Sequence, residues 1–480
     1  MGVARTIRAF FSRALLAAVL VVTATALIAC SGTVVGGRAT SLLFDPERAG
    51  GLPAKQGPSG PRPDAQGPVG TVSDTDDGPI DQLALLAVND IEDFWSTNYD
   101  RYLARDFKPV ETLVSYDSTD PNGPSVCGWV RYQSPNASYC YLDDVMAWDR
   151  RVFMPVAQKH FGDMAVVGVM AHEYGHALQW MSGLVKLSTP TLVKEQQADC
   201  FAGVYLRWVA AGESPRFTLS TADGLNHVLA GIIYSRDELS SSPPDDAHGS
   251  ALDRVSAFQM GFSGGADQCA AIDLVEIGRR QGDLPLSLSD EDAEQSVDVP
   301  IDMTILSSLM YVLDKTFRLD APPSLTDEGA PCADAETTDP VSYCPDSNAI
   351  HVDLPALAAA GEPKDERDGV LIQGDNTALS MVTSRYALAV QHERGLALDT
   401  VVAAIRTACL TGVAQGAMTN PDAALRLSPG DTDEAVSGLL STGLAASDVN
   451  GSVVPAGFTR ILAYRQGLSG STDGCFEQFG

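Results

Sequence analysis

The segments DMAVVGVMAHEYGHALQWMS (residues 163–182) and PTLVKEQQADCFAGVYLRWVAA (residues 190–211) decide the fold of this chain. In both, apolar residues recur at the three- and four-residue intervals of a buried helix. Because positions i and i+4 of a helix share one face, His172 and His176 can reach the same metal ion. The first segment therefore predicts a buried helix that presents two imidazoles, and the second predicts another helix downstream.

The remaining residues of a zinc site follow from the same two segments. A catalytic zinc ion usually has three protein ligands and one open position. Glu195 is the expected third ligand, and Glu173 is placed to act as general base on a metal-activated water. Asp199, one turn beyond Glu195, can accept the second ring proton of His172 or His176, as metal-bound histidines usually require. We expect one zinc ion per chain.

Amide hydrolysis also needs a donor that stabilises the developing oxyanion. The candidates are His248, in a His-Gly-Ser sequence, together with His227 and Tyr174, and His248 is the one included among the site residues. For each of the three taken singly, a packing or surface role is the preferred interpretation. The sequence does not decide among them.

The amino terminus has the features of a bacterial lipoprotein signal. Three arginines precede an apolar run over residues 14–29, which is too short for a membrane span, and Cys30 follows. We predict a signal peptide over residues 1–29 and a lipid on Cys30 that anchors the exported chain to the outer face of the cytoplasmic membrane. A plain signal peptide is the alternative. The Gly/Pro-rich residues 30–78 are predicted to form a disordered tether.

Charge and cysteine content limit the class of protein. The formal net charge is −30, with 62 acidic and 32 basic residues, which makes nucleic acid an unsuitable partner. Nine cysteines are present, and the eight beyond Cys30 form an even set, as expected of disulfides in an exported chain.

The second half of the chain resembles a degenerate copy of the first. RVSAFQMGFSGGADQC (residues 254–269) aligns with RILAYRQGLSGSTDGC (residues 460–475), and Cys200-Phe-Ala-Gly aligns with Cys409-Leu-Thr-Gly. Four cysteines at equivalent places in each copy predict pairing within each copy. The predicted disulfides are Cys127–Cys140, Cys200–Cys269, Cys332–Cys344 and Cys409–Cys475.

The alignment also predicts that only the first copy binds zinc. It sets the metal-binding and catalytic residues against residues that cannot replace them, and all five are lost together. The replacements, in chain order, are Ser384, Arg385, Leu388, Ala404 and Ala408. We place the first domain at residues 79–285 and the degenerate copy at residues 295–480.

Residues 79–275 resemble the bacterial neutral zinc metallopeptidase family. The resemblance rests on four motifs: the HExGH helix with Gln179, Glu-x-Gln-Ala-Asp-Cys-x-Ala-Gly at 195–203, an earlier Cys-Gly…Tyr-Cys stretch, and His-Gly-Ser…Arg at 248–254. The spacing from HExxH to Glu195 and Asp199 is also close to that of thermolysin-like zincins, in which the Asp serves the first His. The resemblance implies a helix-rich α+β, zincin-like peptidase domain, here internally duplicated.

Three functions remain open at this stage. The chain is predicted to be a zinc peptidase that acts on peptides or proteins in the cell envelope. It is alternatively a non-catalytic lipoprotein scaffold, or a zinc hydrolase of a non-peptide amide. The second copy is either a structural partner of the first or a module that binds another protein.

Secondary structure can be assigned only coarsely from the sequence. Helices are predicted at residues 82–104, 148–160, 163–182, 190–211, 221–235 and 249–262, strands near residues 111–116, 128–132 and 139–142, and a loop at residues 238–247.

Overall fold

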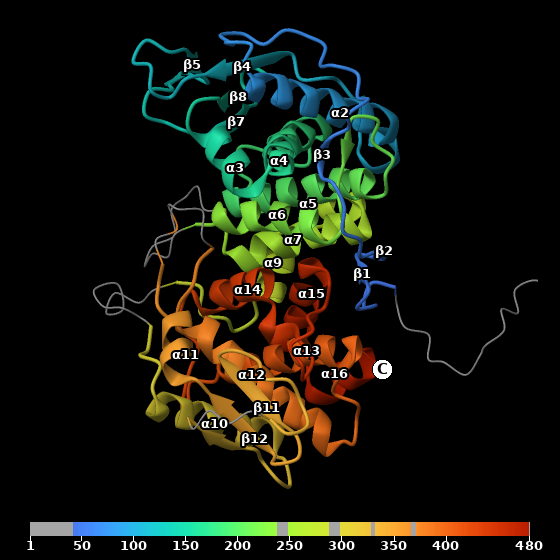
Figure 1. Ribbon diagram of the computed structural model, residues 1–480. Coiled ribbons are helices and arrows are strands. Elements are labelled where there is room, and N and C mark those ends of the chain that lie inside the picture. Colours follow the sequence, from blue (N-terminus) through green and yellow to red (C-terminus); the bar gives the residue numbers. More distant parts are fainter. Residues whose placement is uncertain are drawn as a thin grey trace, which may run out of the picture. The chain divides into compact units, whose positions relative to one another are not determined.

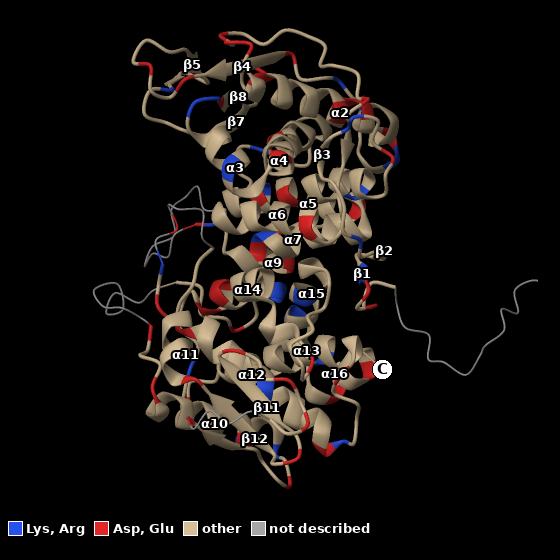
Figure 2. Ribbon diagram, viewed as in Figure 1, with Lys and Arg blue, Asp and Glu red and all other residues tan. Residues whose placement is uncertain are grey.

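The computed structural model describes residues 42–237, 248–287, 298–327, 332–364, 366 and 371–479 (Figure 1). The described residues belong to one compact unit. The predicted signal peptide, Cys30 and the loop predicted at residues 238–247 lie outside them. None of the described helices is both long and apolar enough to cross a bilayer. Acidic residues occur throughout both halves (Figure 2).

The first half is a layer of helices against a small mixed sheet. In the sheet, β8 (Val145–Asp149) lies between β4 (Thr112–Tyr116), to which it is parallel, and β7 (Ala137–Cys140), to which it is antiparallel. The helices are α2 (Pro79–Tyr102), α3 (Phe153–Phe161), α4 (Asp163–Ser182), α5 (Thr191–Ala210), α6 (Asp223–Tyr234), α7 (Ala251–Gly264), α8 (Ala266–Ala270) and α9 (Leu274–Gln281). The predicted helix-rich α+β class is confirmed.

The helix predicted at residues 148–160 begins too early. Residues Val145–Asp149 form the central strand β8, and α3 starts only at Phe153. Four consecutive residues of this strand, from Met146 onward, are buried, so the polar alternation that marks a half-exposed strand is missing. Trp148 is fully buried, and its Nε1 donates to Asp81 at 2.8 Å.

The second half repeats the order of elements found in the first. Its sheet has the order β10-β12-β11, with β12 parallel to β10 and antiparallel to β11. Its strands are β10 (Ser324–Thr326), β11 (Val341–Cys344) and β12 (Ala349–Val352). Its helices are α10 (Met303–Phe317), α11 (Leu354–Ala360), α12 (Asp375–Glu393), α13 (Val401–Ala417), α14 (Asp431–Ser441), α15 (Gly457–Leu468) and α16 (Thr472–Gln478).

Disulfides and glycines fix corresponding helix pairs in the two halves. The structure forms the disulfides Cys127–Cys140, Cys200–Cys269, Cys332–Cys344 and Cys409–Cys475, the same pairs that the sequence repeat predicts. A Cβ atom at Gly203 or Gly261 would overlap the backbone of the facing helix between α5 and α7. Gly412 and Gly467 occupy the matching positions between α13 and α15.

The predicted disorder of residues 30–78 is wrong for residues 42–78, which pack on the first half. Strand β3 (Gly60–Pro61) pairs with β9 (Phe217–Thr218). Arg62 Nε donates to the carbonyl oxygens of Ser214 and Phe217 at 2.9 and 3.0 Å. Composition predicted disorder because the segment has few apolar residues, but its order comes from hydrogen bonds to the loop after α5, whose polar backbone groups need partners.

The two halves share one continuous apolar core. Between them, α6 and α7 pack against α14 and α15. Gln259 Nε2 donates to Phe458 O at 2.8 Å, and the amide of Gly457 donates to Asn226 Oδ1 at 2.9 Å. Phe262 packs against Phe458 with ring centroids 5.1 Å apart. These contacts make the second half a structural partner of the first.

Candidate metal centre

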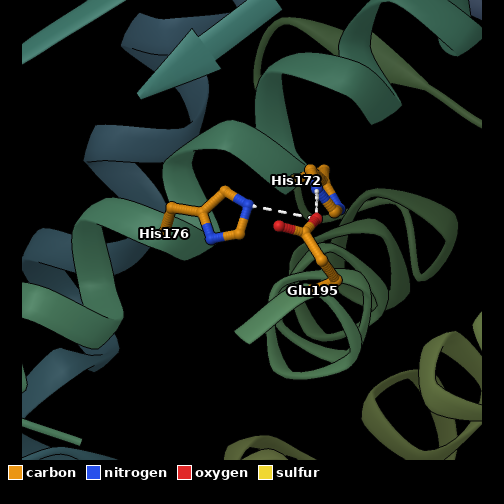
Figure 3. A group of neighbouring side chains, drawn as sticks. All are labelled: His172, His176 and Glu195. Carbon is orange, nitrogen blue, oxygen red and sulfur yellow. Dashed lines mark hydrogen bonds and ion pairs between the residues drawn. The ribbon is translucent and has the colours of Figure 1, made fainter. Parts of the chain in front are cut away.

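His172, His176 and Glu195 converge on one point between α4 and α5 (Figure 3). Oε2 of Glu195 lies 3.1 Å from Nε2 of His172 and 3.4 Å from Nε2 of His176. The two imidazoles come from successive turns of α4, and their ring planes are perpendicular. The three donor atoms lie within 4.8 Å of one another.

The donor set fits a zinc ion. Zinc bonds of about 2.0–2.2 Å place neighbouring tetrahedral ligand atoms roughly 3.3 Å apart, close to the separations found here. Two imidazoles and one carboxylate are typical catalytic zinc ligands that leave a fourth position open. No other side chain from the described residues joins this three-residue group.

Gly175 allows α4 and α5 to approach closely enough for this geometry. A Cβ atom at Gly175 would lie 2.8 Å from Ala198 Cα and 3.0 Å from the Ala198 carbonyl oxygen, closer than real Cβ contacts. Glu195 is one helical turn before Ala198, so the close approach carries its carboxylate to the two histidines. The glycine in the His-Glu-Tyr-Gly-His motif therefore has a packing role.

Asp199 orients His172. Its Oδ1 lies 2.8 Å from His172 Nδ1, which leaves Nε2 facing Glu195. Arg254, on α7, donates through Nε and Nη2 to both oxygens of Asp199 at 2.9 and 2.8 Å. Burial by itself raises the pKa of Asp199, but Arg254 and His172 outweigh it and hold the pKa at about 2. The charged carboxylate can thus fix the tautomer of the histidine.

His176 is oriented by a chain of amide groups. Its Nδ1 lies 3.1 Å from Gln179 Oε1, and Gln179 Nε2 donates to the Lys194 carbonyl oxygen at 2.6 Å. Gln197 contacts Gln179 and donates to the Ile272 carbonyl oxygen at 3.0 Å. Buried Gln179 therefore ties the second histidine to the start of α5.

The charges of the three ligands reinforce one another. Burial lowers the pKa of His172, but Asp199 and Glu195 outweigh it and raise the pKa to about 10. Burial raises the pKa of Glu195, yet the two histidines hold it well below its usual value. Since a metal ion binds only the deprotonated imidazole, metal binding here competes with protons.

Glu173 lies next to the ligands at the edge strand of the sheet. Its Oε2 accepts a hydrogen bond from the backbone amide of Tyr139, on β7, at 2.9 Å. Because β7 is the outer strand of its sheet, this amide is free to point toward the site. Glu173 also lines the same pocket as His172.

The pocket beside the metal ligands has a volume of about 220 Å³ and a mainly apolar lining. Its polar end contains His172, Glu173, Asp199, His248 and Arg254. Its apolar walls come from α3 to α7 and include Phe153, Phe161, Val169, Leu206, Val228 and Phe258.

Of the three proposed oxyanion donors, the structure brings only His248 to the site. His248 Nε2 lies 3.8 Å from Glu195 Oε2, and its Nδ1 lies 3.1 Å from Asp237 Oδ1. Tyr174 is fully buried and donates to Glu92 on α2, away from the ligands. His227 is exposed on α6 and does not line the pocket.

Sequence reasoning missed the supporting roles of Arg254, Asp237, Gln197 and the Tyr139 amide. Arg254 belongs to the His-Gly-Ser…Arg motif, so the sequence marked it as a residue of interest. The sequence did not indicate that Arg254 binds Asp199. Asp237 precedes a Ser/Pro-rich stretch of sequence and has no periodic pattern around it. The Tyr139 contact uses backbone, for which a sequence carries no direct signal.

The corresponding place in the second half has no metal-binding group among the residues described. Ser384 donates to the Met381 carbonyl oxygen at 2.6 Å. Arg385, aligned with Glu173, is fully buried and donates to the Leu444 carbonyl oxygen and to Ser447 Oγ at 2.9 and 2.6 Å. A guanidinium that donates to loop oxygens therefore occupies the place that the alignment gives to the Glu173 carboxylate.

The first half of the chain is similar to one family of known proteins. Residues 39–272 match the model of a family described as putative neutral zinc metallopeptidase. The match covers slightly less than half of the chain and contains His172, Glu173, His176, Glu195 and His248. It also starts well before α2, in agreement with the packed segment at residues 42–78. No curated protein and no solved structure matches the chain.

The substitution Gly175→Ala should weaken zinc binding without removing any ligand. The added methyl group meets the α5 backbone, so α5 must move and take Glu195 away from the histidines. We expect zinc affinity, measured by chelator competition, to fall about tenfold or more, with a loss of about 1–3 kcal/mol in unfolding free energy.

Gly168→Ala on the same helix is the matched control. Its Cβ atom would meet only Val228 Cγ1, at an ordinary 3.7 Å, so zinc affinity should stay at the parent value. Equal zinc affinity for Gly175→Ala and the parent would contradict the packing role of Gly175.

Proposed function

We propose that the chain is a zinc-dependent peptidase whose active site is the His172/His176/Glu195 centre. The observation that carries the proposal is the convergence of these three donors, one of which, His172, lines an apolar pocket together with Glu173. The zinc metallopeptidase family match over the same residues supports it. A structural zinc site, by contrast, is usually closed by four Cys or His ligands.

Glu173 is the general base of the proposed reaction. Zinc in a site of this kind supplies Lewis-acid polarisation of a carbonyl and a water that ionises near neutral pH. Glu173 takes a proton from the attacking water and delivers it to the leaving amine nitrogen. The amide of Tyr139 holds one carboxylate oxygen of Glu173, which limits the rotation of its side chain.

His248 stabilises the oxyanion in this proposal. Its Nδ1 is held by Asp237, so the opposite nitrogen, Nε2, faces the ligand Glu195. A donor at this place lies near the oxygen of a carbonyl polarised by the metal. Such a donor commonly lowers the activation barrier of acyl transfer by about 3 kcal/mol.

The apolar pocket favours substrates that have a large apolar side chain next to the scissile bond. Aromatic and branched residues form most of its wall, and a cavity of about 220 Å³ can hold a side chain of the size of leucine or phenylalanine. The proposed substrates are therefore peptides or unfolded segments of proteins rather than small polar amides.

Glu173→Gln should abolish most cleavage while keeping the metal. The amide oxygen of Gln can still accept from Tyr139, but Gln cannot take a proton, so cleavage of an unfolded protein should fall about 10²–10⁴-fold. Zinc content, measured by mass spectrometry, should stay at one ion per chain. His172→Ala, the companion variant, should lose zinc and activity together.

Two results would count against this scheme. Cleavage at the parent rate by Glu173→Gln would remove Glu173 from the mechanism. A zinc-loaded parent that cleaves no peptide bond would remove the peptidase function and leave a metal-binding protein.

His248→Ala should lower kcat with little change in KM or zinc content. The expected loss is about 10²–10³-fold, the usual effect of removing one oxyanion donor. His227→Ala, an exposed histidine on the neighbouring helix α6, is the control and should match the parent. If both variants keep the parent kcat, His248 has no role in the reaction.

We further propose that the second half is a degenerate copy that arose by internal duplication. Support comes from the shared strand order, the equivalent disulfides and the matching glycines of the close helix pairs. Gln391 Nε2 also contacts the Ala403 carbonyl oxygen at 3.2 Å, as Gln179 contacts that of Lys194. Two zinc ions per chain would contradict the loss of the site in the second copy.

The proposed location is the cell envelope, with the chain exported and held to the membrane by a lipid on Cys30. Four disulfides support an oxidising compartment. The support for the lipid is the sequence Leu27-Ile28-Ala29-Cys30 after a short apolar run.

Cys30→Ala should release the exported chain from the membrane. In bacteria fed a labelled fatty acid, the parent should carry label and sediment with membranes, whereas the variant should carry none and stay soluble. The label requires the thiol of Cys30, because lipoproteins are acylated on that residue. A parent chain that never takes up label would show that the segment is a plain signal peptide.

A further inference from the structure

A second group of acidic side chains lies far from the zinc centre, at the start of helices α12 and α14. Asp298, Asp375 and Glu434 each place a carboxylate oxygen within 4.8 Å of the other two. Asp375 is the first residue of α12, Glu434 lies in the first turn of α14, and Asp298 precedes α10. Asp375 and Glu434 are only 3% and 4% exposed.

Only one of the two carboxylate oxygens of Asp375 has a hydrogen-bond partner among the described residues. Its Oδ2 accepts the backbone amide of Val299 at 2.7 Å. Its Oδ1 is buried and has no hydrogen-bond partner among the described residues. A buried charged oxygen without a partner is costly, and one that faces further carboxylates is more so. This atom therefore requires a positive partner.

Among the described residues, no basic side chain supplies that partner to Asp375 or Glu434. Within the described ranges, neither Asp375 nor Glu434 forms an ion pair with Lys, Arg or His. A third buried carboxylate, Asp431, adds to the negative charge, although Ser428 already donates to both of its oxygens. Burial, and then the neighbouring carboxylates, raise the pKa of Glu434 to about 9 and that of Asp431 to about 8.

The backbone at the start of α12 holds the Glu434 carboxylate in this position. Its Oε2 accepts the amide of Asn376 at 2.8 Å. Its Oε1 lies so close to Gly374 that a Cβ atom there would overlap it. Asp433, the neighbouring residue, points the other way and accepts the amide of Leu252 in the first half at 3.3 Å. The acidic first turn of α14 (Figure 2) thus serves two different partners.

We propose that Asp298, Asp375 and Glu434 bind a calcium ion. Calcium takes oxygen ligands at about 2.3–2.6 Å. The three carboxylate oxygens lie within 4.8 Å of one another, near enough to contact one such ion. Three carboxylates without nitrogen or sulfur donors favour a hard cation over zinc. The ion joins the start of α12, the start of α14 and the segment before α10.

The test is calcium binding to the zinc-loaded full chain at pH 8, where protons compete less with calcium for the carboxylates than they do at neutral pH. Calorimetry should show one calcium ion per chain. At 5 mM calcium the unfolding temperature should rise by about 2–5 °C, as expected for a site of roughly 0.1 mM affinity. Because neither readout uses cleavage, the result is independent of the proposed peptidase function.

Asp375→Asn and Glu434→Gln should each weaken calcium binding at least tenfold and abolish the thermal shift. Without calcium, both variants should unfold at or above the parent temperature, because a repelling charge is removed. Asp422→Asn, which changes an exposed carboxylate outside the group, should bind calcium like the parent. If Asp375→Asn does not fold, Glu434→Gln decides the question.

Two outcomes overturn the proposal. In the first, calorimetry detects no calcium binding to the parent chain and calcium does not raise its unfolding temperature. The carboxylates are then neutralised by protons and not by calcium. A parent that binds calcium with the same affinity as a folded Asp375→Asn or Glu434→Gln chain binds it elsewhere.

Discussion

The buried carboxylate of Asp199 is the interaction on which the zinc centre depends. It carries a charge inside the protein only because Arg254 donates to both of its oxygens and His172 to one. These contacts join α4, α5 and α7, three helices that glycines allow to pack backbone to backbone. The ligand geometry is therefore a property of the packed helices rather than of any one of them.

The described part of the second half has no such metal-binding group at the corresponding place, but it has the same close helix packing. Gly412 and Gly467 still let α13 and α15 meet, and Cys409–Cys475 still joins them. At the position aligned with Glu173, Arg385 donates a hydrogen bond to the carbonyl oxygen of Leu444. If the second half is the degenerate copy that we propose, the demands of core packing account for its small and apolar residues, because these demands do not depend on catalysis. The half now serves as a rigid support for α6 and α7.

Helix α14 is the part of this support that connects most features. Asp433 in its first turn caps α7, the helix of Arg254, and lies 3.6 Å from Arg236, the residue before Asp237. Asp237 in turn holds His248. Glu434, one residue further, belongs to the carboxylate group at the start of α12. The order of α14 therefore bears on both the proposed calcium site and the environment of His248, the proposed oxyanion donor, since one helical turn contacts both.

The sequence by itself determined the helix-rich class, the candidate metal ligands and the disulfide pairs, because these depend on spacing within a helix and on a repeat that aligns residue by residue. It misplaced the start of α3 and missed the order of residues 42–78, since a buried strand has no alternation and a Gly/Pro-rich segment no apolar signal. Only the tertiary structure decided how Arg254, Asp237 and the Tyr139 amide support the site, and how Asp298, Asp375 and Glu434 meet. These residues are distant in the chain. Their contacts depend on how the helices and strands pack, which local sequence patterns do not specify.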